Sequence, residues 1–230
     1  MSTDPLAGIP GLIRIETTPR TSATSPPAKL TECGLAHEEL YGRFVTLESH
    51  LDCPPEEVFD YLADPYNLQE WTYGVRDLKP IGRSHAPGDG WDTVLEGWDR
   101  LSDDTRIYIR AHTDRQALTV DYHCAWDQSE DLWMVYLYRL VCAERVLGQP
   151  GTVLLWTNCR HRYYDENPYP ETAPSPRRPW VGEYWDFFRV GHAVELRNLA
   201  TILEYRHRQR SRQRPDDRFF ADGTVGVNQP

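Results

Sequence analysis

Residues 45–72 read VTLESHLDCPPEEVFDYLADPYNLQEWT, and this stretch carries signals for one strand and two short helices. Apolar and polar side chains broadly alternate up to Leu51, which is typical of a half-buried strand. Asp52 then offers a helix cap, and the two prolines and two glutamates after it suit a first helical turn. The pair Asp64-Pro65 ends this helix, and Tyr66–Trp71 is expected to form a second one.

Six more strand candidates follow this opening, and polar turns separate them. The turn PGDG at 87–90 and the turn GQPG at 148–151 are the clearest. Short turns between strands predict hairpins and therefore an antiparallel meander. The expected strands cover residues 73–81, 90–98, 105–112, 118–126, 132–146 and 151–164.

A long helix is predicted after a proline-rich loop at 167–179, from Trp180 to about His207. Its apolar residues recur at spacings of three and four, as in an amphipathic helix. The predicted inner face carries Val181, Tyr184, Trp185, Phe188, Gly191, His192, Glu195, Leu199 and Ile202. Strands segregated from one long helix indicate an α+β fold, in which a curved antiparallel sheet of about seven strands wraps around the C-terminal helix.

The two ends of the chain differ from this central pattern. Residues 1–38 include a run of Thr, Ser and Pro with little to bury, and residues 209–230 are Arg-rich and then polar. We therefore expect a flexible N-terminal tail over 1–38, one folded domain over 39–208, and a C-terminal tail over 209–230.

The formal net charge of −10 argues against a nucleic-acid partner. The arginines from Arg206 to Arg214 are a local exception with two interpretations: a site for an anionic partner, or a solvated helix end where cations suit the helix dipole. No apolar run is long enough to span a bilayer, and the N-terminus does not resemble a signal peptide. Five cysteines without CxxC spacing fit reduced thiols, so we expect a cytoplasmic protein.

Aromatic residues make up 12% of the chain, with eight Trp and thirteen Tyr. Buried Tyr and Trp need partners for their polar tips. Three uses remain open: the lining of a cavity, a bulky core, or a subunit interface. The last of these would make the protein a homodimer.

The opening stretch resembles that of the START-like, Bet v 1-like superfamily, in particular its polyketide cyclase/dehydrase branch. The matching features are the first strand, Pro-x-x-x-Val-Phe ending at Phe59, Leu-Ala-Asp-Pro ending at Pro65, then Trp71, and the later strand opening at Gly151. The resemblance covers roughly residues 43–205 and implies a helix-grip fold with a deep apolar cavity. Members of the superfamily include polyketide aromatases and cyclases, lipid-transfer domains, hormone receptors and proteins that sequester natural products. Because the fold hosts many activities, the function has to be argued from the cavity.

The sequence contains no metal motif, phosphate-binding loop or serine elbow, so neither a metal nor a cofactor is expected. Cofactor-free acid/base chemistry needs a proton shuttle and donors that hold a developing oxyanion. His192 and Glu195 are three residues apart and therefore share a helix face that is otherwise apolar. The alternative is that both lie at the wet edge of that face.

Strand residues are harder to assign, because the sequence does not fix which alternate side chains face the helix. Our candidate catalytic residues are His192, His123, Tyr136 and Arg160. Our candidate ligand-binding residues are Tyr138, Asn158, Trp185, Phe188 and Glu195.

Three functions fit these features. We favour a cofactor-free cyclase, aromatase or dehydratase that acts on a hydrophobic, polyketide-like intermediate. The second is a non-catalytic binder that carries or sequesters a hydrophobic small molecule. The third is a protein-interaction role in which the two tails recruit a partner.

Overall fold

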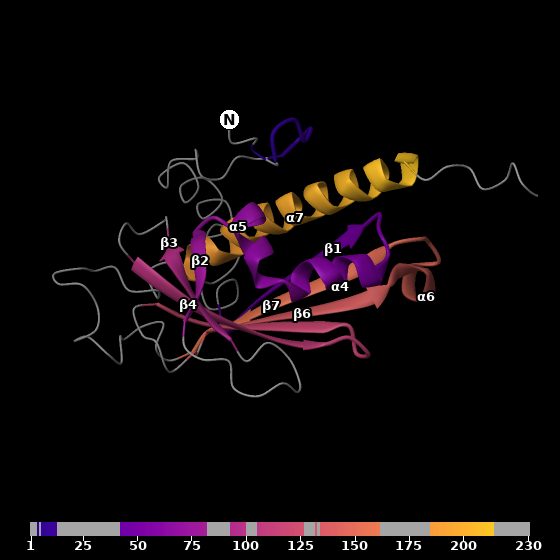
Figure 1. Cartoon of the computed structure of the whole chain (residues 1–230). Helices are drawn as coiled ribbons and strands as arrows, with labels where there is room; N and C mark the ends of the chain where they lie inside the picture. The colour runs from indigo at the N-terminus through magenta and orange to yellow at the C-terminus, as the bar shows by residue number, and fades with distance from the viewer. Residues whose placement is uncertain are drawn as a thin grey trace, which may run out of the picture.

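The computed structural model describes residues 4, 6–12, 42–81, 93–99, 105–126, 132, 134–161 and 185–213. Within them, seven strands form one antiparallel sheet in the order β1-β7-β6-β5-β4-β3-β2 (Figure 1). The strands are β1 (Phe44–Leu51), β2 (Val75–Ile81), β3 (Val94–Asp99), β4 (Thr105–Asp114), β5 (Thr119–Trp126), β6 (Met134–Cys142) and β7 (Thr152–Cys159). The helical elements are α4 (Pro55–Ala63), η2 (Pro65–Asn67), α5 (Leu68–Trp71), α6 (Ala143–Leu147) and α7 (Trp185–Gln213).

Strands β2 to β7 pair in chain order, which confirms the predicted meander. Strand β1 forms one edge of the sheet and pairs with β7, with Val45 opposite Asn158. The strand expected over 132–146 was wrong at its end, because β6 stops at Cys142 and α6 follows. Gly148 ends α6 with a φ of 68°, a left-handed conformation that glycine adopts at low cost.

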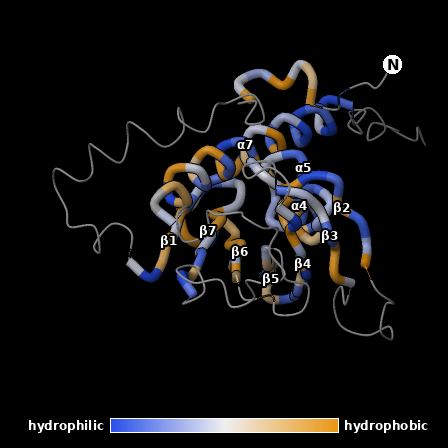
Figure 2. Tube along the Cα trace, turned by 90° about the vertical axis from the view of Figure 1, so that its left-hand side faces the viewer, coloured by the Kyte–Doolittle hydropathy of each residue, from blue (hydrophilic) through white to orange (hydrophobic). Residues whose placement is uncertain are grey.

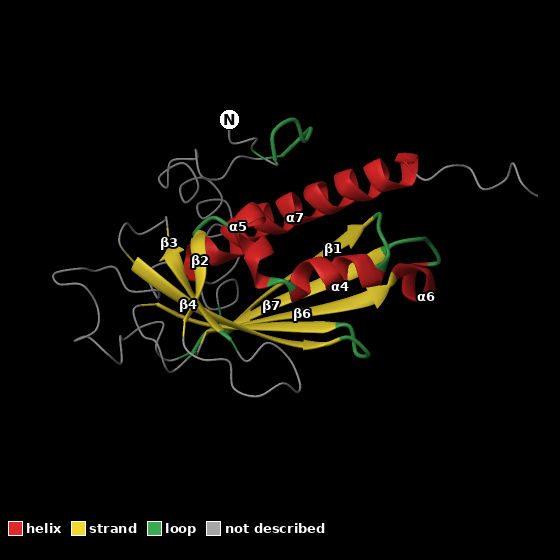
Figure 3. Ribbon diagram, in the orientation of Figure 1, coloured by secondary structure: helices red, strands yellow, loops and turns green. Residues whose placement is uncertain are grey.

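The fold has two layers, with α4, α5 and α7 on one face of the curved sheet (Figure 3). Helix α4 packs on β4, β5 and β6, and α7 packs on β1 and α5. In Figure 2, hydrophobic segments occur along β1, β6, α4 and α7, and α7 lies across the top of the strands. This is the helix-grip fold expected from the sequence. No helix in the described ranges is both long enough and apolar enough to cross a membrane.

The start of α4 differs from the expected cap. Pro54 is its N-cap residue and makes no side-chain cap, so the assignment of Asp52 to this role was wrong. The backbone N–H of Asp52 instead donates to Glu204 Oε1 of α7 at 3.1 Å. The predicted break after α4 is confirmed, since Asp64 ends the helix and its side chain accepts from the Tyr66 N–H.

The C-terminal half of α7 is anchored by ion pairs. Arg206 donates to both carboxylate oxygens of Glu70, at 2.8 and 3.0 Å. Glu57 pairs with His207 at 2.7 Å and with Arg210. The arginine run is therefore not simply a solvated helix end, and neither interpretation of the sequence foresaw these contacts. Helix α7 also continues to Gln213, past the predicted end near His207.

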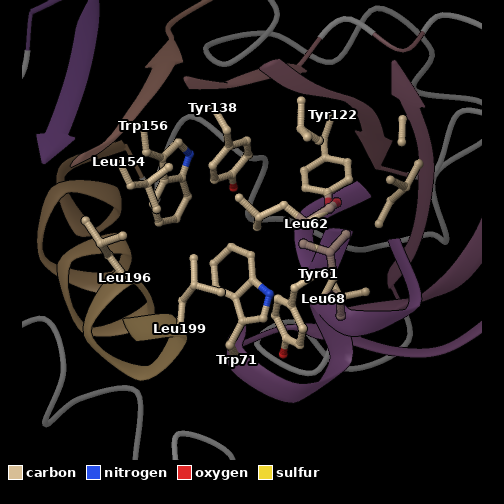
Figure 4. Packing of buried hydrophobic residues seen from close by; sticks show 14 of the residues in the cluster. Tyr61, Leu62, Leu68, Trp71, Tyr122, Tyr138, Leu154, Trp156, Leu196 and Leu199 are labelled. Atoms are coloured by element: carbon tan, nitrogen blue, oxygen red, sulfur yellow. The ribbon is translucent and has the colours of Figure 1, made fainter. Parts of the chain in front are cut away.

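The core lies between α7 and the sheet and is strongly aromatic. Figure 4 shows Trp156 and Tyr138 from the sheet facing Trp71 of α5 and Leu199 of α7. Near the N-terminus, Ile9 is buried in the same hydrophobic cluster. The inner side of the sheet is thus built from large side chains that several separate elements supply.

Candidate functional site

The sheet register identifies the side chains that face α7. Tyr138 is opposite Trp156, and Tyr136 is opposite Asn158, in neighbouring rows of the β6–β7 pair. Tyr138, Trp156 and Asn158 are buried, whereas Leu155 and Leu137 of the other parity are exposed. The inner parity is therefore the even-numbered one on β6 and β7, which brings Tyr136, Tyr138 and Asn158 to the helix side.

The centre of the candidate site is a buried pair on α7. His192 Nδ1 lies 2.6 Å from Glu195 Oε2, and the two side chains are only 12% and 6% exposed. The wet-edge alternative is therefore wrong. A carboxylate can only accept hydrogen bonds, so Nδ1 is the donor in this pair. The other oxygen, Glu195 Oε1, accepts from the backbone N–H of Tyr73 at 2.6 Å.

A glycine helps to bring Tyr73 to this pair. A Cβ on Gly191 would lie 2.7 Å from ring carbons of Phe187, so the missing side chain leaves room for that ring against α7. Phe187 in turn packs edge-on against Tyr73, with ring centroids 5.5 Å apart. This contact holds the Tyr73 backbone beside α7, where its N–H reaches Glu195. Both oxygens of the carboxylate are thus fixed.

Aromatic rings surround His192. Its ring centroid lies 4.4 Å from Trp156, 5.0 Å from Phe188 and 5.7 Å from Tyr136. Trp185 lies 6.0 Å from Phe188. These rings exclude water from the imidazole, and electrostatic interactions are stronger where water is excluded.

Arg160 extends this row of rings. Its guanidinium carbon lies 5.6 Å from the ring centroid of Trp185, in cation–π geometry. The row Arg160, Trp185, Phe188 and His192 thus joins the end of β7 to the inner face of α7. Arg160 carries the one positive charge among our candidate residues that does not depend on a titrating proton.

Around His192, three buried nitrogen atoms have no hydrogen-bond partner within the described part of the chain: His192 Nε2, Trp156 Nε1 and Trp71 Nε1. Trp71 and Trp156 are almost fully buried, and their ring centroids are 5.7 Å apart. Most buried polar groups in proteins are hydrogen-bonded, so unpartnered ones call for an explanation. Three such atoms in one aromatic cluster make this region our candidate ligand site.

The inner tyrosines are held in their protonated form. Burial, with Tyr122 nearby, raises the pKa of Tyr138 well above its ordinary value of 10. Burial also raises the pKa of Tyr122, whose hydroxyl donates to the backbone carbonyl of Leu62. Burial and the nearby Glu195 raise the pKa of Tyr73 to about 12. These phenols can therefore donate hydrogen bonds but do not serve as bases at neutral pH.

The structure does not bring His123 to this site. In β5 the side chains that face the helices are those of Val120, Tyr122 and Cys124, so His123 lies on the outer face of the sheet. There its ring contacts His112, with centroids 4.9 Å apart. Burial and His112 lower the pKa of His123. The prediction placed His123 with His192 because the strand parity was not known.

Two features of the site were not singled out from the sequence. Trp156 shares its strand face with Asn158, and that parity would have identified it once a register was chosen. The Tyr73 amide leaves no sequence signal, because it is a backbone group positioned by packing. Among the described residues, no group of three or more His, Cys, Asp or Glu side chains could hold a metal ion.

No protein-family model matches the chain, and no curated protein sequence matches it. Among solved structures, the chain is similar to the Zhui aromatase/cyclase from Streptomyces sp. R1128. The TM-score is 0.48 at 15% identity, over 73% of this chain and 94% of that one.

Two further solved structures are similar. The di-domain aromatase/cyclase StfQ from the steffimycin pathway has a TM-score of 0.45 at 13% identity, over 72% of this chain and 46% of that one. A norcoclaurine synthase point mutant from Thalictrum flavum has a TM-score of 0.45 at 10% identity, over 72% and 96%. The fold expected from residues 45–72 is the one that the strands and helices of this chain form, and function is inferred below from the site itself.

Proposed function

We propose that the protein is a cofactor-free acid/base enzyme that cyclises or dehydrates a hydrophobic, carbonyl-bearing intermediate of the polyketide kind. In this proposal His192 moves the proton, and Glu195 orients it. Tyr136 and Arg160 polarise a carbonyl, while Tyr138, Asn158, Trp185 and Phe188 hold the rest of the substrate. His123 has no role, because it lies on the outer face of the sheet.

The observation that carries the proposal is the pairing of His192 with Glu195. The Nδ1 proton is committed to the carboxylate at 2.6 Å, which leaves the lone pair of the neutral imidazole on Nε2. Nε2 is buried and has no hydrogen-bond partner among the described residues. A carboxylate that fixes the tautomer and orientation of a histidine is a recurring way to prepare a general base.

The reaction steps follow from this arrangement. Nε2 takes a proton from a carbon next to a carbonyl, and the C–H electron pair moves to form an enolate. The enolate carbon attacks a second carbonyl of the same substrate, which forms a C–C bond and an alkoxide. The imidazolium returns the proton to that alkoxide. A second proton removal with loss of the hydroxyl as water then gives the dehydrated ring, so no oxidant or reductant is needed.

Carbon-acid exchange tests this proposal without knowledge of the natural substrate. The probe is 1-tetralone, an aromatic bicyclic ketone with acidic C–H bonds beside its carbonyl. In D2O at neutral pD, a buried base exchanges these protons for deuterium, and mass spectrometry follows the mass increase. We expect exchange above the buffer rate, and we expect His192→Ala to reduce the protein-dependent rate roughly 100- to 10,000-fold.

His123→Ala is the matched control, since it removes the same side chain from the opposite face of the sheet. It should leave the exchange rate within about two-fold of the unchanged protein. If His192→Ala exchanges as fast as the unchanged protein, the proposed role of His192 is wrong. Saturable binding of 1-tetralone with exchange at the buffer rate would favour the second candidate, a carrier or sequestering protein, which the largely aromatic inner face also supports.

A further inference from the structure

The ring next to His192 points to an additional function for one side chain. We propose that Trp156 Nε1 is the donor that binds the substrate's carbonyl oxygen beside His192, and that the substrate is an aromatic carbonyl compound. This inference rests on the proposed function, because it assigns the oxygen of the carbonyl that forms the enolate, and Tyr136 and Arg160 then act on the second carbonyl.

The burial of Trp156 supports this assignment. Trp156 is 2% exposed, and its indole nitrogen has no hydrogen-bond partner in the described ranges. An indole N–H can only donate, so its partner must be an acceptor. In the ligand-free protein this N–H is desolvated without compensation, which proteins tolerate mainly where function requires it.

The position of Trp156 beside His192 also supports the assignment. Trp156 has its ring centroid 4.4 Å from His192, closer than any other ring contact of that imidazole in the described residues. An N–H donor and an unpartnered base on adjacent rings match the two atoms of an enolisable ketone, its oxygen and the neighbouring C–H carbon. A donor at that oxygen stabilises the charge that develops when the proton leaves.

The surroundings define the kind of molecule. The Trp156 ring stacks on Tyr138 at 5.3 Å with an interplanar angle of 21°, and it meets Trp71 edge-on at 5.7 Å. In Figure 4 the nitrogen edge of Trp156 turns toward Tyr138 and away from Leu196 and Leu199. Because aromatic rings surround Trp156, a flat aromatic ligand suits this region better than a flexible aliphatic chain does. The oxygen acceptor and the ring system together specify an aromatic carbonyl compound.

The test compares two probes of the same shape. 1-Tetralone carries the carbonyl, and tetralin is the same bicyclic skeleton without oxygen. Binding is measured by ligand-observed NMR titration, which does not require turnover. We expect the unchanged protein to prefer 1-tetralone, and Trp156→Phe to weaken 1-tetralone binding roughly 5- to 100-fold while tetralin changes less than about three-fold.

Trp98→Phe is the matched control. Trp98 lies on the outer face of the sheet beside Arg106, whereas the site residues of β6 and β7 lie on its inner face, so both affinities should stay unchanged. The tetralin series also reports any general loss of packing caused by the smaller ring. A shape effect alone would weaken both probes equally.

The outcomes separate this inference from the proposed function. Equal affinity of the unchanged protein for the two probes, or a preference for 1-tetralone that survives in Trp156→Phe, overturns the assignment of Trp156. That result leaves the proposed function standing if His192→Ala still abolishes exchange. Conversely, if Trp156→Phe removes the preference while His192→Ala exchanges normally, the oxygen site stands and the catalytic proposal fails.

Discussion

Replacing Glu195 by glutamine should switch the tautomer of His192 without unfolding the protein. Glu195 Oε1 accepts from the Tyr73 N–H, so in Glu195→Gln the amide oxygen must take that position. The amide NH2 then occupies the position of Oε2, where it faces His192 Nδ1. Since an NH2 group donates, Nδ1 has to accept, and the imidazole proton moves to Nε2. The substitution thereby removes the lone pair that the proposed reaction uses.

Glu195→Gln should change the exchange rate strongly and the free energy of unfolding only slightly. Loss of a correctly placed base lowers rates about 100- to 10,000-fold, which corresponds to about 2.7–5.4 kcal/mol of barrier. The effect on folding is smaller, because both hydrogen bonds persist with a neutral group in place of a charged one. That exchange costs about 1–2 kcal/mol per bond, and relief from burying a carboxylate offsets part of it. We expect a net loss of about 1 kcal/mol in the free energy of unfolding.

Three measurements check this prediction. Deuterium exchange into 1-tetralone gives the rate, urea unfolding gives the stability, and 15N NMR of the imidazole reports which nitrogen carries the proton. Glu195→Ala is the comparison, since it leaves both the Tyr73 N–H and His192 Nδ1 unpaired and should cost about 2–6 kcal/mol. The reasoning is refuted if Glu195→Gln exchanges at the original rate, or if its NMR spectrum shows the proton still on Nδ1.

Three further predictions concern the rest of the fold. Gly151 has a φ of 114°, and an added Cβ would lie 2.4 Å from a backbone oxygen. Urea unfolding should therefore show that Gly151→Ala lowers the free energy of unfolding by more than about 2 kcal/mol. Gly148→Ala, which has open space around the added Cβ, should lower it by about 1 kcal/mol. Burial raises the pKa of Cys53 to about 12 and also raises that of Cys124, so peptide mapping should find neither alkylated by iodoacetamide in the folded protein at pH 8. The pKa of His123 is lowered in the folded protein, so as the pH drops below 6.5 its imidazole is protonated in the unfolded chain before it is protonated in the folded one. The melting temperature should therefore fall as the pH drops below 6.5, and His123→Gln should flatten that fall.

Local patterns were enough to predict most of the architecture. The alternation in β1, the prolines before α4 and the break at Asp64 each act within a few residues, so the sequence exposes them directly. The error in residues 143–146 also comes from local pattern, because the short segment Ala-Glu-Arg-Val fits the end of a strand or one turn of helix equally well until its surroundings in the fold are known.

The site was predictable only in part, for a geometric reason. On α7 the spacing of His192 and Glu195 fixes their common face, so the pair could be foreseen. On the strands a shift of one residue exchanges the two faces, and both faces of β5 carry polar or aromatic groups. The register with β4 and β6 is a long-range property of the sheet. It alone separates Tyr122 on the inner side from His123 on the outer side.

The N-terminal half of α7 carries His192 of the candidate site, and its C-terminal half carries ion pairs that stabilise the fold. Each unpartnered buried nitrogen costs about 1–3 kcal/mol, so the three of His192, Trp156 and Trp71 together approach the net stability of a typical domain. The C-terminal half of α7 carries contacts that offset this cost. Arg206 pairs with Glu70, which also accepts a hydrogen bond from the Tyr61 hydroxyl, and His207 pairs with Glu57. Those acidic partners lie on α4 and α5, next to Trp71. A helix anchored at one end in this way can hold an unsatisfied, reactive surface at the other, and a bound ligand that satisfies those nitrogens should stabilise the whole fold.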